Sequence, residues 1–185
     1  LAGSSRYCYR SVRTPDPLTE SSLFVDRIRE YLRHEPIDVL LPISDASALA
    51  SLPIRDSLGT TIIPFPSVDA FLRICDKHAV MRAARDVGIM VPEQRVIETL
   101  ASAKSTDFRE LGFPLVLKPA RSVVSTNGKR SKTAVLHVSD TTALQQALRS
   151  FPEAAYPVLV QRRIVGPGVG VFLLLWKGEI FAAFS

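Results

Sequence analysis

The stretch FPLVLKPARSVVSTNGKRSKT, residues 113–133, decides the fold that we predict for this chain. Its apolar run, 114–117, is typical of a buried strand, and the run ends on Lys118. A polar segment follows, and it carries the further cations Arg121, Lys129, Arg130 and Lys132. A lysine at the end of a buried strand needs an anionic partner, and beside cations and backbone N–H groups a nucleoside triphosphate is the commonest small one. The alternative is a lysine that reaches solvent, followed by an ordinary basic loop.

Composition sets the frame for this segment. The chain has 185 residues, of which 46% are hydrophobic and 22% are charged, as expected of one sizeable folded domain or two small ones. No apolar run approaches the length of a membrane span, so we expect a cytoplasmic protein without membrane contact. The net charge of +5 favours anionic partners without choosing between nucleotide and nucleic acid.

The two cysteines and the two ends of the chain add smaller expectations. Cys8 and Cys75 lie far apart, which favours free thiols over a disulfide. The chain begins at Leu1 rather than methionine and ends at Ser185 inside an apolar run. Both ends are typical of a piece of a longer protein.

Residues 1–66 predict half of a doubly wound α/β sheet. Strands are expected at 6–12, 37–42 and 62–63, and helices at 20–34, capped by Thr19, and from 44 or 45 to about 52. Asp45, with Ser44 and Ser47, directly follows the second of these strands. It therefore either lines a crevice at the carboxyl end of the sheet or caps the following helix.

Residues 67–185 predict a mixed α+β layer. Helices are expected at 68–74, 77–87, 104–111 and 140–150, and strands at 94–98, 114–119, 134–138, 158–165, 169–176 and 179–184. Phe172 and Trp176 share one face of their strand, so we expect both in the core. The change of pattern predicts a domain boundary between residues 66 and 67.

Four segments stand in an order that resembles the ATP-grasp superfamily, most closely its carboligase-like members related to the large subunit of carbamoyl-phosphate synthase. They are DKHAVMRAARDVGIMVPEQ from Asp76, FPLVLKPARS from Phe113, the helix with Leu144, Ala147 and Leu148, and VLVQRRIVGPGVGVF from Val158. The stretch SLFVDRIREYLRHEPIDVLLPISD resembles the second half of the preceding domain in those enzymes. The resemblance implies an α/β fold, with a partial Rossmann-like pre-ATP-grasp domain at 1–66 and the N-terminal α+β lobe of an ATP-grasp domain at 67–185.

The resemblance also implies where the phosphates of ATP would lie. Lys77 would lie near them, Lys118 would contact the α-phosphate and often the adenine edge, and the segment 122–132 would fold over the β- and γ-phosphates. Many relatives have a glycine-rich loop there, whereas this chain has only Gly128. We therefore expect contacts from side chains in and beside this loop, namely Arg121, Ser125, Lys129 and Arg130.

The adenine would lie at the segment Gln161, Arg162, Arg163 and Ile164. Many relatives read "QEY" here, with an acidic side chain. An arginine offers only donors and cannot accept a hydrogen bond from the adenine amino group, so any role of that acid is lost. Recognition through the backbone of these residues does not depend on the side chain and is retained in our prediction.

Magnesium in the family is held by acids downstream of the last predicted strand. Glu179 is the only acid after Glu153, so we expect ATP and Mg²⁺ as cofactors but no metal ligand and no catalytic residue within this chain. For the full-length protein the resemblance implies ATP-dependent ligation of a small carboxylate to an amine or thiol through an acyl phosphate. We expect the full-length protein to form a homo-oligomer and not to bind nucleic acid. A degenerate scaffold and a basic anion- or nucleic-acid-binding module remain open alternatives.

Overall fold

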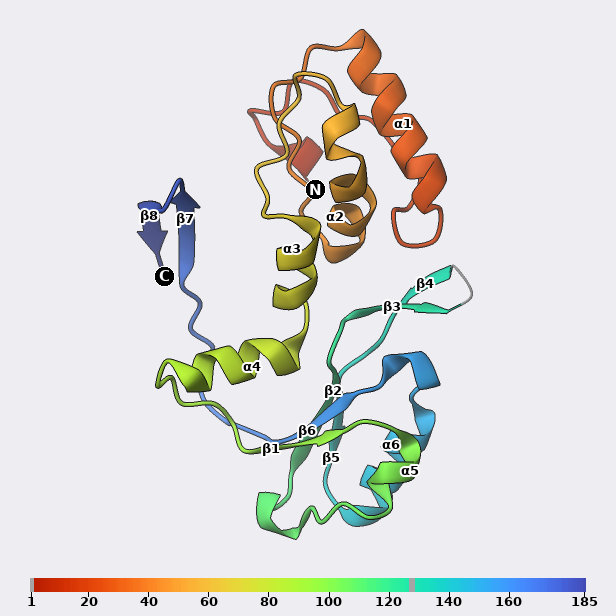
Figure 1. Cartoon of the computed structure of the whole chain (residues 1–185), viewed down its shortest axis with the longest axis vertical. Helices are drawn as coiled ribbons and strands as arrows, with labels where there is room; N and C mark the ends of the chain where they lie inside the picture. The colour runs from red at the N-terminus through yellow and green to blue at the C-terminus, as the bar shows by residue number, and fades with distance from the viewer. Residues whose placement is uncertain (1, 127–128) are drawn as a thin grey trace.

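The computed structural model describes residues 2–126 and 129–185. Asn127 and Gly128, which belong to the predicted phosphate loop, lie outside the described residues. Figure 1 shows a group of helices at one end, a sheet with flanking helices at the other, and a separate two-stranded hairpin. No helix among the described residues combines the length and the apolar character that crossing a membrane requires.

The first region is helical, with a minimal parallel pairing. It contains η1 (Ala2–Ser4), α1 (Ser21–His34), α2 (Asp45–Ser51) and η2 (Leu52–Ser57). Ser44 caps α2 through a reciprocal bond with Ser47, whereas α1 starts after Glu20 without a side-chain cap, so the predicted Thr19 cap is wrong. The helices close over a small apolar cluster of buried residues, namely Ala48, Leu52, Leu58, Ile63 and Phe71.

The strands predicted in this region are largely absent. Residues 6–12 form no strand, and the predicted strands 37–42 and 62–63 meet only in one isolated parallel bridge, between Val39 and Ile62. Both side chains of that bridge are exposed. A parallel pair is stable only when further strands extend it and helices cover both faces, and the described residues supply neither. Of the predicted Rossmann-like alternation of strands and helices, only the helices and one β-bridge remain in this region.

Two helices connect this region to the sheet. They are α3 (Val68–Ile74) and α4 (Lys77–Asp86), capped by Ser67 and Asp76 respectively. Phe71 of α3 packs in the apolar cluster of the first region. The boundary between residues 66 and 67 therefore stays a prediction.

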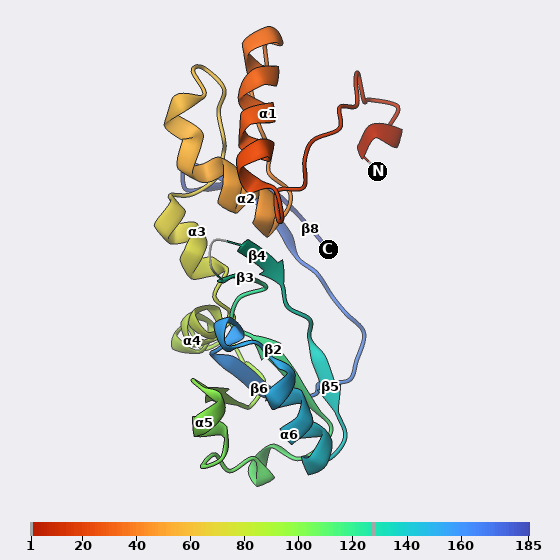
Figure 2. The same ribbon diagram turned by 90° about the vertical axis from the view of Figure 1, so that its right-hand side faces the viewer.

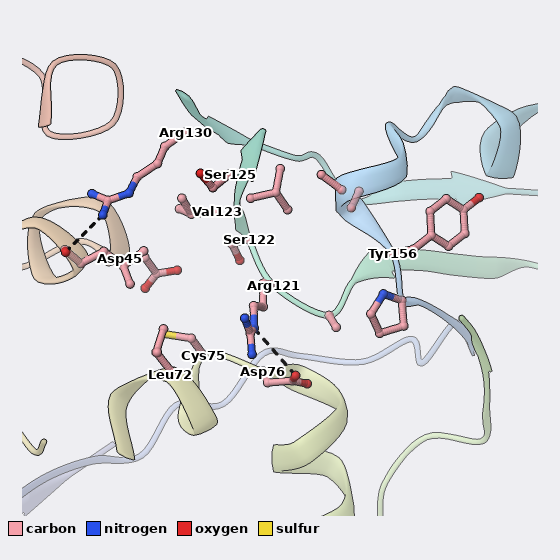
Figure 3. Close-up of a pocket in the computed structure, with 16 residues that line it drawn as sticks. Asp45, Leu72, Cys75, Asp76, Arg121, Ser122, Val123, Ser125, Arg130 and Tyr156 are labelled. Carbon is pink, nitrogen blue, oxygen red and sulfur yellow. Dashed lines mark hydrogen bonds and ion pairs between the residues drawn. The ribbon is translucent and has the colours of Figure 1, made fainter. Parts of the chain in front are cut away.

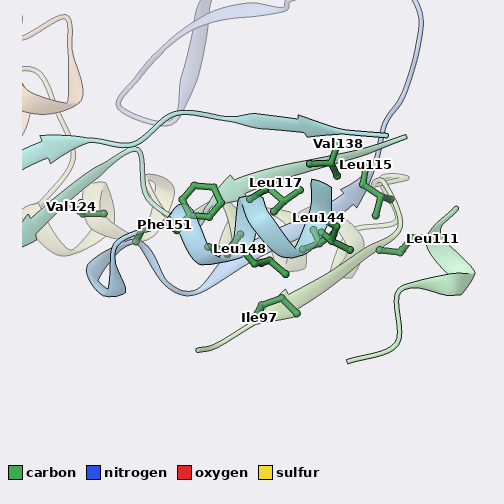
Figure 4. Close-up of a cluster of buried hydrophobic side chains, with 13 residues drawn as sticks. Ile97, Leu111, Leu115, Leu117, Val124, Val138, Leu144, Leu148 and Phe151 are labelled. Atoms are coloured by element: carbon green, nitrogen blue, oxygen red, sulfur yellow. The ribbon is translucent and has the colours of Figure 1, made fainter. Parts of the chain in front are cut away.

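The second region is built on a four-stranded antiparallel sheet. Its strands are β1 (Gln94–Ile97), β2 (Leu115–Pro119), β5 (Leu136–Val138) and β6 (Val158–Arg162), in the order β1-β6-β2-β5. One face is covered by α6 (Thr141–Ser150), capped by Asp140, and followed by η4 (Glu153–Ala155). Leu115 and Leu117 point into the core beneath α6, as Figure 4 shows. Side chains alternate along a strand, so Val116 and Lys118 belong to the opposite face.

The helix predicted at 104–111 does not form. A shorter helix, α5 (Leu100–Ala103), begins earlier because Thr99 caps it, and only η3 (Arg109–Leu111) follows. The hydroxyls of Ser102, Ser105 and Thr106 donate to backbone carbonyls of residues 99 and 102. Such local bonds compete with helical ones, which explains why the chain leaves the helix here.

The predicted phosphate loop is largely a β-hairpin. Its strands are β3 (Val123–Thr126) and β4 (Lys129–Lys132), which pair antiparallel and extend from the sheet toward α2 (Figure 1). We call residues 122–133 the flap. The sequence does not predict these strands, because their residues do not alternate between apolar and polar side chains.

The last two strands form a hairpin that nothing among the described residues covers. They are β7 (Phe172–Trp176) and β8 (Glu179–Phe184), joined at Lys177 and Gly178, and every residue in them is exposed. Phe172 is 58% exposed and Trp176 43%, so the expectation that both lie in the core is wrong. The strands predicted at 158–165 and 169–176 are also shorter than expected, since residues 163–171 form an irregular exposed connection.

Candidate functional site

Lys77 connects α4 to the end of the central strand. Its backbone N–H donates to the carbonyl of Ala120 at 2.8 Å, which fixes the start of α4 against the residue after β2. Its ammonium donates to the carbonyl of Pro119 at 3.3 Å and to the hydroxyl of Ser122 at 3.0 Å. The side chain is half-buried and lies where β2 turns into the flap.

Lys118 lies one residue before that turn. It is opposite Leu159 of β6 in the antiparallel register, on the face of the sheet that α6 does not cover. The side chain is half-buried and makes no hydrogen bond or ion pair with any residue that the structure describes. A strand thus presents a cation that has no protein partner in residues 2–126 and 129–185.

The two ammonium groups act on each other. Burial lowers the pKa of Lys77 from its ordinary value, and the charge of Lys118 lowers it further, against an opposing effect of Asp45. A nearby anion would offset both the cost of burying the Lys77 charge and its repulsion from Lys118. The pair therefore concentrates positive charge where α4 meets β2.

Arg121 is held beside this pair by the cap of α4. One carboxylate oxygen of Asp76 accepts from the N–H groups of His78 and Ala79, and the other lies 3.8 Å from Nε of Arg121. Figure 3 shows this contact at the edge of a cavity of about 510 Å³ between the flap, η4 and α2–α3. The side chain of Arg121 is 53% exposed, so its other donors remain available to a ligand.

The flap residues divide into two groups. Ser125 lines the cavity and Lys129 is exposed at the start of β4. Arg130 also lines the cavity, on the side of α2 (Figure 3), and it donates to the hydroxyl of Ser21 at 3.0 Å and to the carbonyl of Leu49 at 3.3 Å. Arg130 therefore fastens the flap to α1 and α2.

The predicted adenine segment begins inside the sheet. Gln161 is 4% exposed, and its amide donates to the side-chain oxygen of Gln94 on β1 at 2.6 Å. It lies opposite Val116, so it shares with Lys118 the face of the sheet opposite α6. Its side chain is engaged in cross-strand bonding, and β6 is paired with β1 and β2 on either side of it.

Arg162 and Arg163 are tied to neighbouring backbone. The guanidinium of Arg162 donates to the carbonyls of Leu111 at 2.8 Å and Glu110 at 3.3 Å, and forms an ion pair with Glu93 at 3.2 Å. The backbone N–H groups of Arg162 and Arg163 donate to the carbonyls of Glu93 and Pro114. Among the described residues the N–H of Ile164, whose side chain is 68% exposed, has no acceptor.

These groups form two sites on one strand pair. Arg162 lies opposite Leu115, three residues along β2 from Lys118, a spacing of about 10 Å. The lysines and Arg121 thus gather at one end of β2, and the segment 161–164 lies at the other. Ser122 and Asp76 complete the first group. Of these two added residues, only Asp76 could have been identified from the sequence, because it precedes the helix in the motif DKHA as a capping residue does.

The structure also bears on the segment after residue 42. Ser44 caps α2, and Asp45 lines the cavity between the flap, η4 and α2–α3. The sheet whose carboxyl end would form the predicted crevice is reduced to the bridge between Val39 and Ile62, so Asp45 lines a different hollow. Within residues 2–126 and 129–185, no three acidic, histidine or cysteine side chains gather as metal ligands would.

Comparisons with known proteins bear on the sequence and the fold of the chain. No family model matches the chain. The carbamoyl phosphate synthase large chain of Rubrobacter xylanophilus is 24% identical over 165 residues, which is 82% of this chain but 15% of the relative. This chain therefore spans a small part of that protein.

Solved structures give the same result at the level of the fold. The L-amino acid ligase of Bacillus licheniformis superposes with a TM-score of 0.60 and 18% identity, over 87% of this chain and 35% of the ligase. A RimK domain ATP-grasp protein of Sphaerobacter thermophilus gives 0.54 and 21%, over 80% and 54%. Carboxyaminoimidazole ribonucleotide synthase of Aspergillus clavatus, solved with ATP, gives 0.52 and 19%, over 84% and 37%. The fold of this chain is that of the ATP-grasp ligases, with a partial Rossmann-like region followed by their α+β lobe.

Proposed function

We propose that this chain is the ATP-binding portion of an ATP-dependent carboxylate–amine or carboxylate–thiol ligase. In the whole protein the γ-phosphate would activate a small carboxylate as an acyl phosphate, and the amine or thiol would then displace the phosphate. Such chemistry needs positioning and charge neutralisation rather than a protein nucleophile. Mg²⁺ would supply much of that neutralisation when bound, through ligands outside the residues described here.

The observation that carries the proposal is the pair of half-buried ammonium groups of Lys77 and Lys118. Burial and the charge of Lys118 both lower the pKa of Lys77, and the side chain of Lys118 forms no ion pair with a described residue. A protein that keeps two cations close together and partly desolvated needs an anion of more than one charge to offset that cost. The phosphates of a nucleotide meet this requirement, with Arg121, Ser125 and Lys129 closing over them from the flap.

The adenine would lie against the backbone of 161–164, about 10 Å along the strand pair from the lysines. Ile164 provides a backbone N–H there without a described partner. This arrangement fits a nucleotide that runs between the lysine end of β2 and the exposed segment that follows β6. The ATP complex of the Aspergillus clavatus synthase, which has the same fold, supports the same choice of ligand.

One observation favours a second candidate, a scaffold that has lost ATP binding. Arg162 stands where many relatives have an acid, and its guanidinium and backbone N–H are all bonded to neighbouring segments. If the segment 161–164 serves only to hold β6 against residues 93 and 110–111, no purine would bind there. A titration with ATP separates the two candidates.

Calorimetric titration of the 185-residue chain with ATP in the presence of Mg²⁺ tests the proposal. We expect saturable binding that Lys118→Ala weakens by at least tenfold, because the variant removes the cation with no protein partner. Lys104→Ala, which removes the same charge from the opposite side of the sheet, should leave the affinity unchanged. Absence of saturable binding in the parent chain, or equal loss in both variants, would contradict the proposal and favour the scaffold.

The pH dependence of the same titration isolates Lys77. The folded protein holds the pKa of this ammonium below its ordinary value of 10.5, and ATP prefers the protonated form. Affinity should therefore fall as the pH rises through that lowered pKa toward 10.5, and binding at and above the lowered pKa should be accompanied by proton uptake, which should vanish well below it. Calorimetry in buffers of different ionisation enthalpy measures that proton uptake. In Lys77→Gln the uptake that comes from Lys77 should be absent.

A further inference from the structure

A second concave surface lies on the opposite side of the sheet from the two lysines. It is a groove of about 900 Å³ between α6 and the segment from α5 to Phe113, at the end of the molecule remote from α1 (Figure 2). We call it the α5–α6 groove. It shares no lining residue with the cavity beside Arg121. The proposed nucleotide site does not use it.

The floor of the groove is apolar. Leu144 and Leu148 of α6 form its base, and both are also part of the main core. Leu100 and Phe113 line it while remaining 42% and 41% exposed, and Phe108 is half-buried beside them. Apolar side chains that converge on one hollow in this way are typical of a small-molecule site.

The rim of the groove is cationic. Lys104 and Arg149 line it and form no ion pair with any residue in 2–126 or 129–185. The one acid in the lining, Asp107, is bound by Arg109 through Nε and Nη2, and this contact lowers the pKa of Asp107 to about 2. Asp107 and Arg109 therefore cancel each other at neutral pH. The remaining two charges are both positive.

From the apolar floor and the uncompensated cations, we propose that the α5–α6 groove binds a small amphipathic carboxylate. The apolar tail lies over Leu100, Phe108 and Phe113, and the carboxylate lies at the rim between Lys104 and Arg149. A carboxylate suits an arginine rim because the guanidinium can bind both of its oxygens. This site is independent of the proposed ATP site.

The dimensions of the groove favour a small molecule over a protein partner. Its volume of about 900 Å³ lies within the range of about 300–1,000 Å³ that ligand pockets occupy. Thirteen residues line it, whereas a stable protein interface takes roughly 20–30 residues from each side. An acidic peptide would match the charge but would extend well beyond the groove.

Titration of the ¹⁵N-labelled 185-residue chain with decanoate, below the concentration at which it forms micelles, tests this proposal by NMR. We expect saturable shifts confined to the amides of 100–113 and 141–149. Decyltrimethylammonium, which has the same tail and the opposite charge, should bind at least tenfold more weakly. Lys104→Gln combined with Arg149→Gln should also weaken decanoate at least tenfold, whereas Arg73→Gln with Arg82→Gln, two exposed cations on α3 and α4, should not.

Two neighbouring positions on α6 supply a steric control. Gln145 lines the groove, whereas Gln146 is exposed on the same helix outside it. Gln145→Trp should abolish decanoate binding, and Gln146→Trp should leave it unchanged. Equal binding of the two amphiphiles, shifts that map to the β7–β8 hairpin, or decanoate binding that survives Gln145→Trp each overturn the proposal. So does an acidic amphipathic peptide that shifts the groove amides when decanoate does not.

Discussion

The central sheet and the β7–β8 hairpin are built from similar sequences and have opposite environments. VLVQR in β6 has four residues buried, with Val158, Leu159 and Val160 fully so, whereas every residue of FLLLW in β7 is exposed. Both are apolar and both pair antiparallel. The difference lies in what covers them, because α6 and two neighbouring strands enclose β6 and no described residue covers either face of β7. Hydrophobic sequence thus predicts strand formation here, while burial depends on a layer supplied elsewhere.

The largest expected effect compares one leucine from each region. Leu117→Ala should cost about 2–5 kcal/mol of unfolding free energy, because this side chain is fully buried under α6. Leu174→Ala, at 57% exposure, should change it by no more than about 0.5 kcal/mol. Urea denaturation measures both. A similar cost at the two positions would show that the hairpin is covered in solution, and the contrast between the regions would fail.

A smaller effect on unfolding free energy is expected at α6, the helix that covers the central sheet. The Asp140 carboxylate accepts from the N–H of Ala143 at 2.9 Å and caps α6. Asp140→Ala should cost about 1 kcal/mol in the same denaturation experiment. Gln146→Ala, an exposed change within the helix, is the matched control and should be near neutral. Equal effects of the two variants would mean that the cap does not hold the covering layer.

The smallest expected effect concerns the flap, a two-stranded ribbon that is anchored where β7–β8 is not. Arg130→Ala removes its bonds to Ser21 and Leu49 and should lower the local opening free energy of β3–β4 by about 0.5 kcal/mol. Hydrogen exchange of the flap amides should accelerate accordingly. Lys132→Ala, exposed on the same strand, should leave exchange unchanged, and matching acceleration in both would assign the protection to the ribbon itself.

Local chemistry explains which elements were predictable. The bounds of α3 match the prediction because Ser67 marks its start, and α6 follows Asp140 as expected. The helix predicted at 104–111 from periodicity is wrong, since the hydroxyls of Ser102 and Thr106 bond the backbone instead. The flap strands alternate among polar residues, so they carry no apolar pattern that could reveal them.

The candidate site divides in the same way. The position of Lys118 at the end of a strand was predictable because an apolar run ends on a cation, and the structure brings its charge near Lys77. That the two bind phosphate stays a prediction. The roles of Arg130 and Arg162 were not readable from sequence, because their partners lie 81–109 and 51–52 residues away. Sequence indicates which residues carry charge, and the tertiary structure decides which charges are consumed by the protein itself.

The bonds of Arg162 make positions 162 and 93 depend on each other. Glutamate at position 162 would place a carboxylate against Glu93 and against the carbonyls of residues 110 and 111, so a single codon change would replace three attractions by repulsions. An acid at position 162 would therefore require a compensating change at position 93. Sequences that descend from this chain are expected to keep a base at position 162 for as long as they keep the acid at 93.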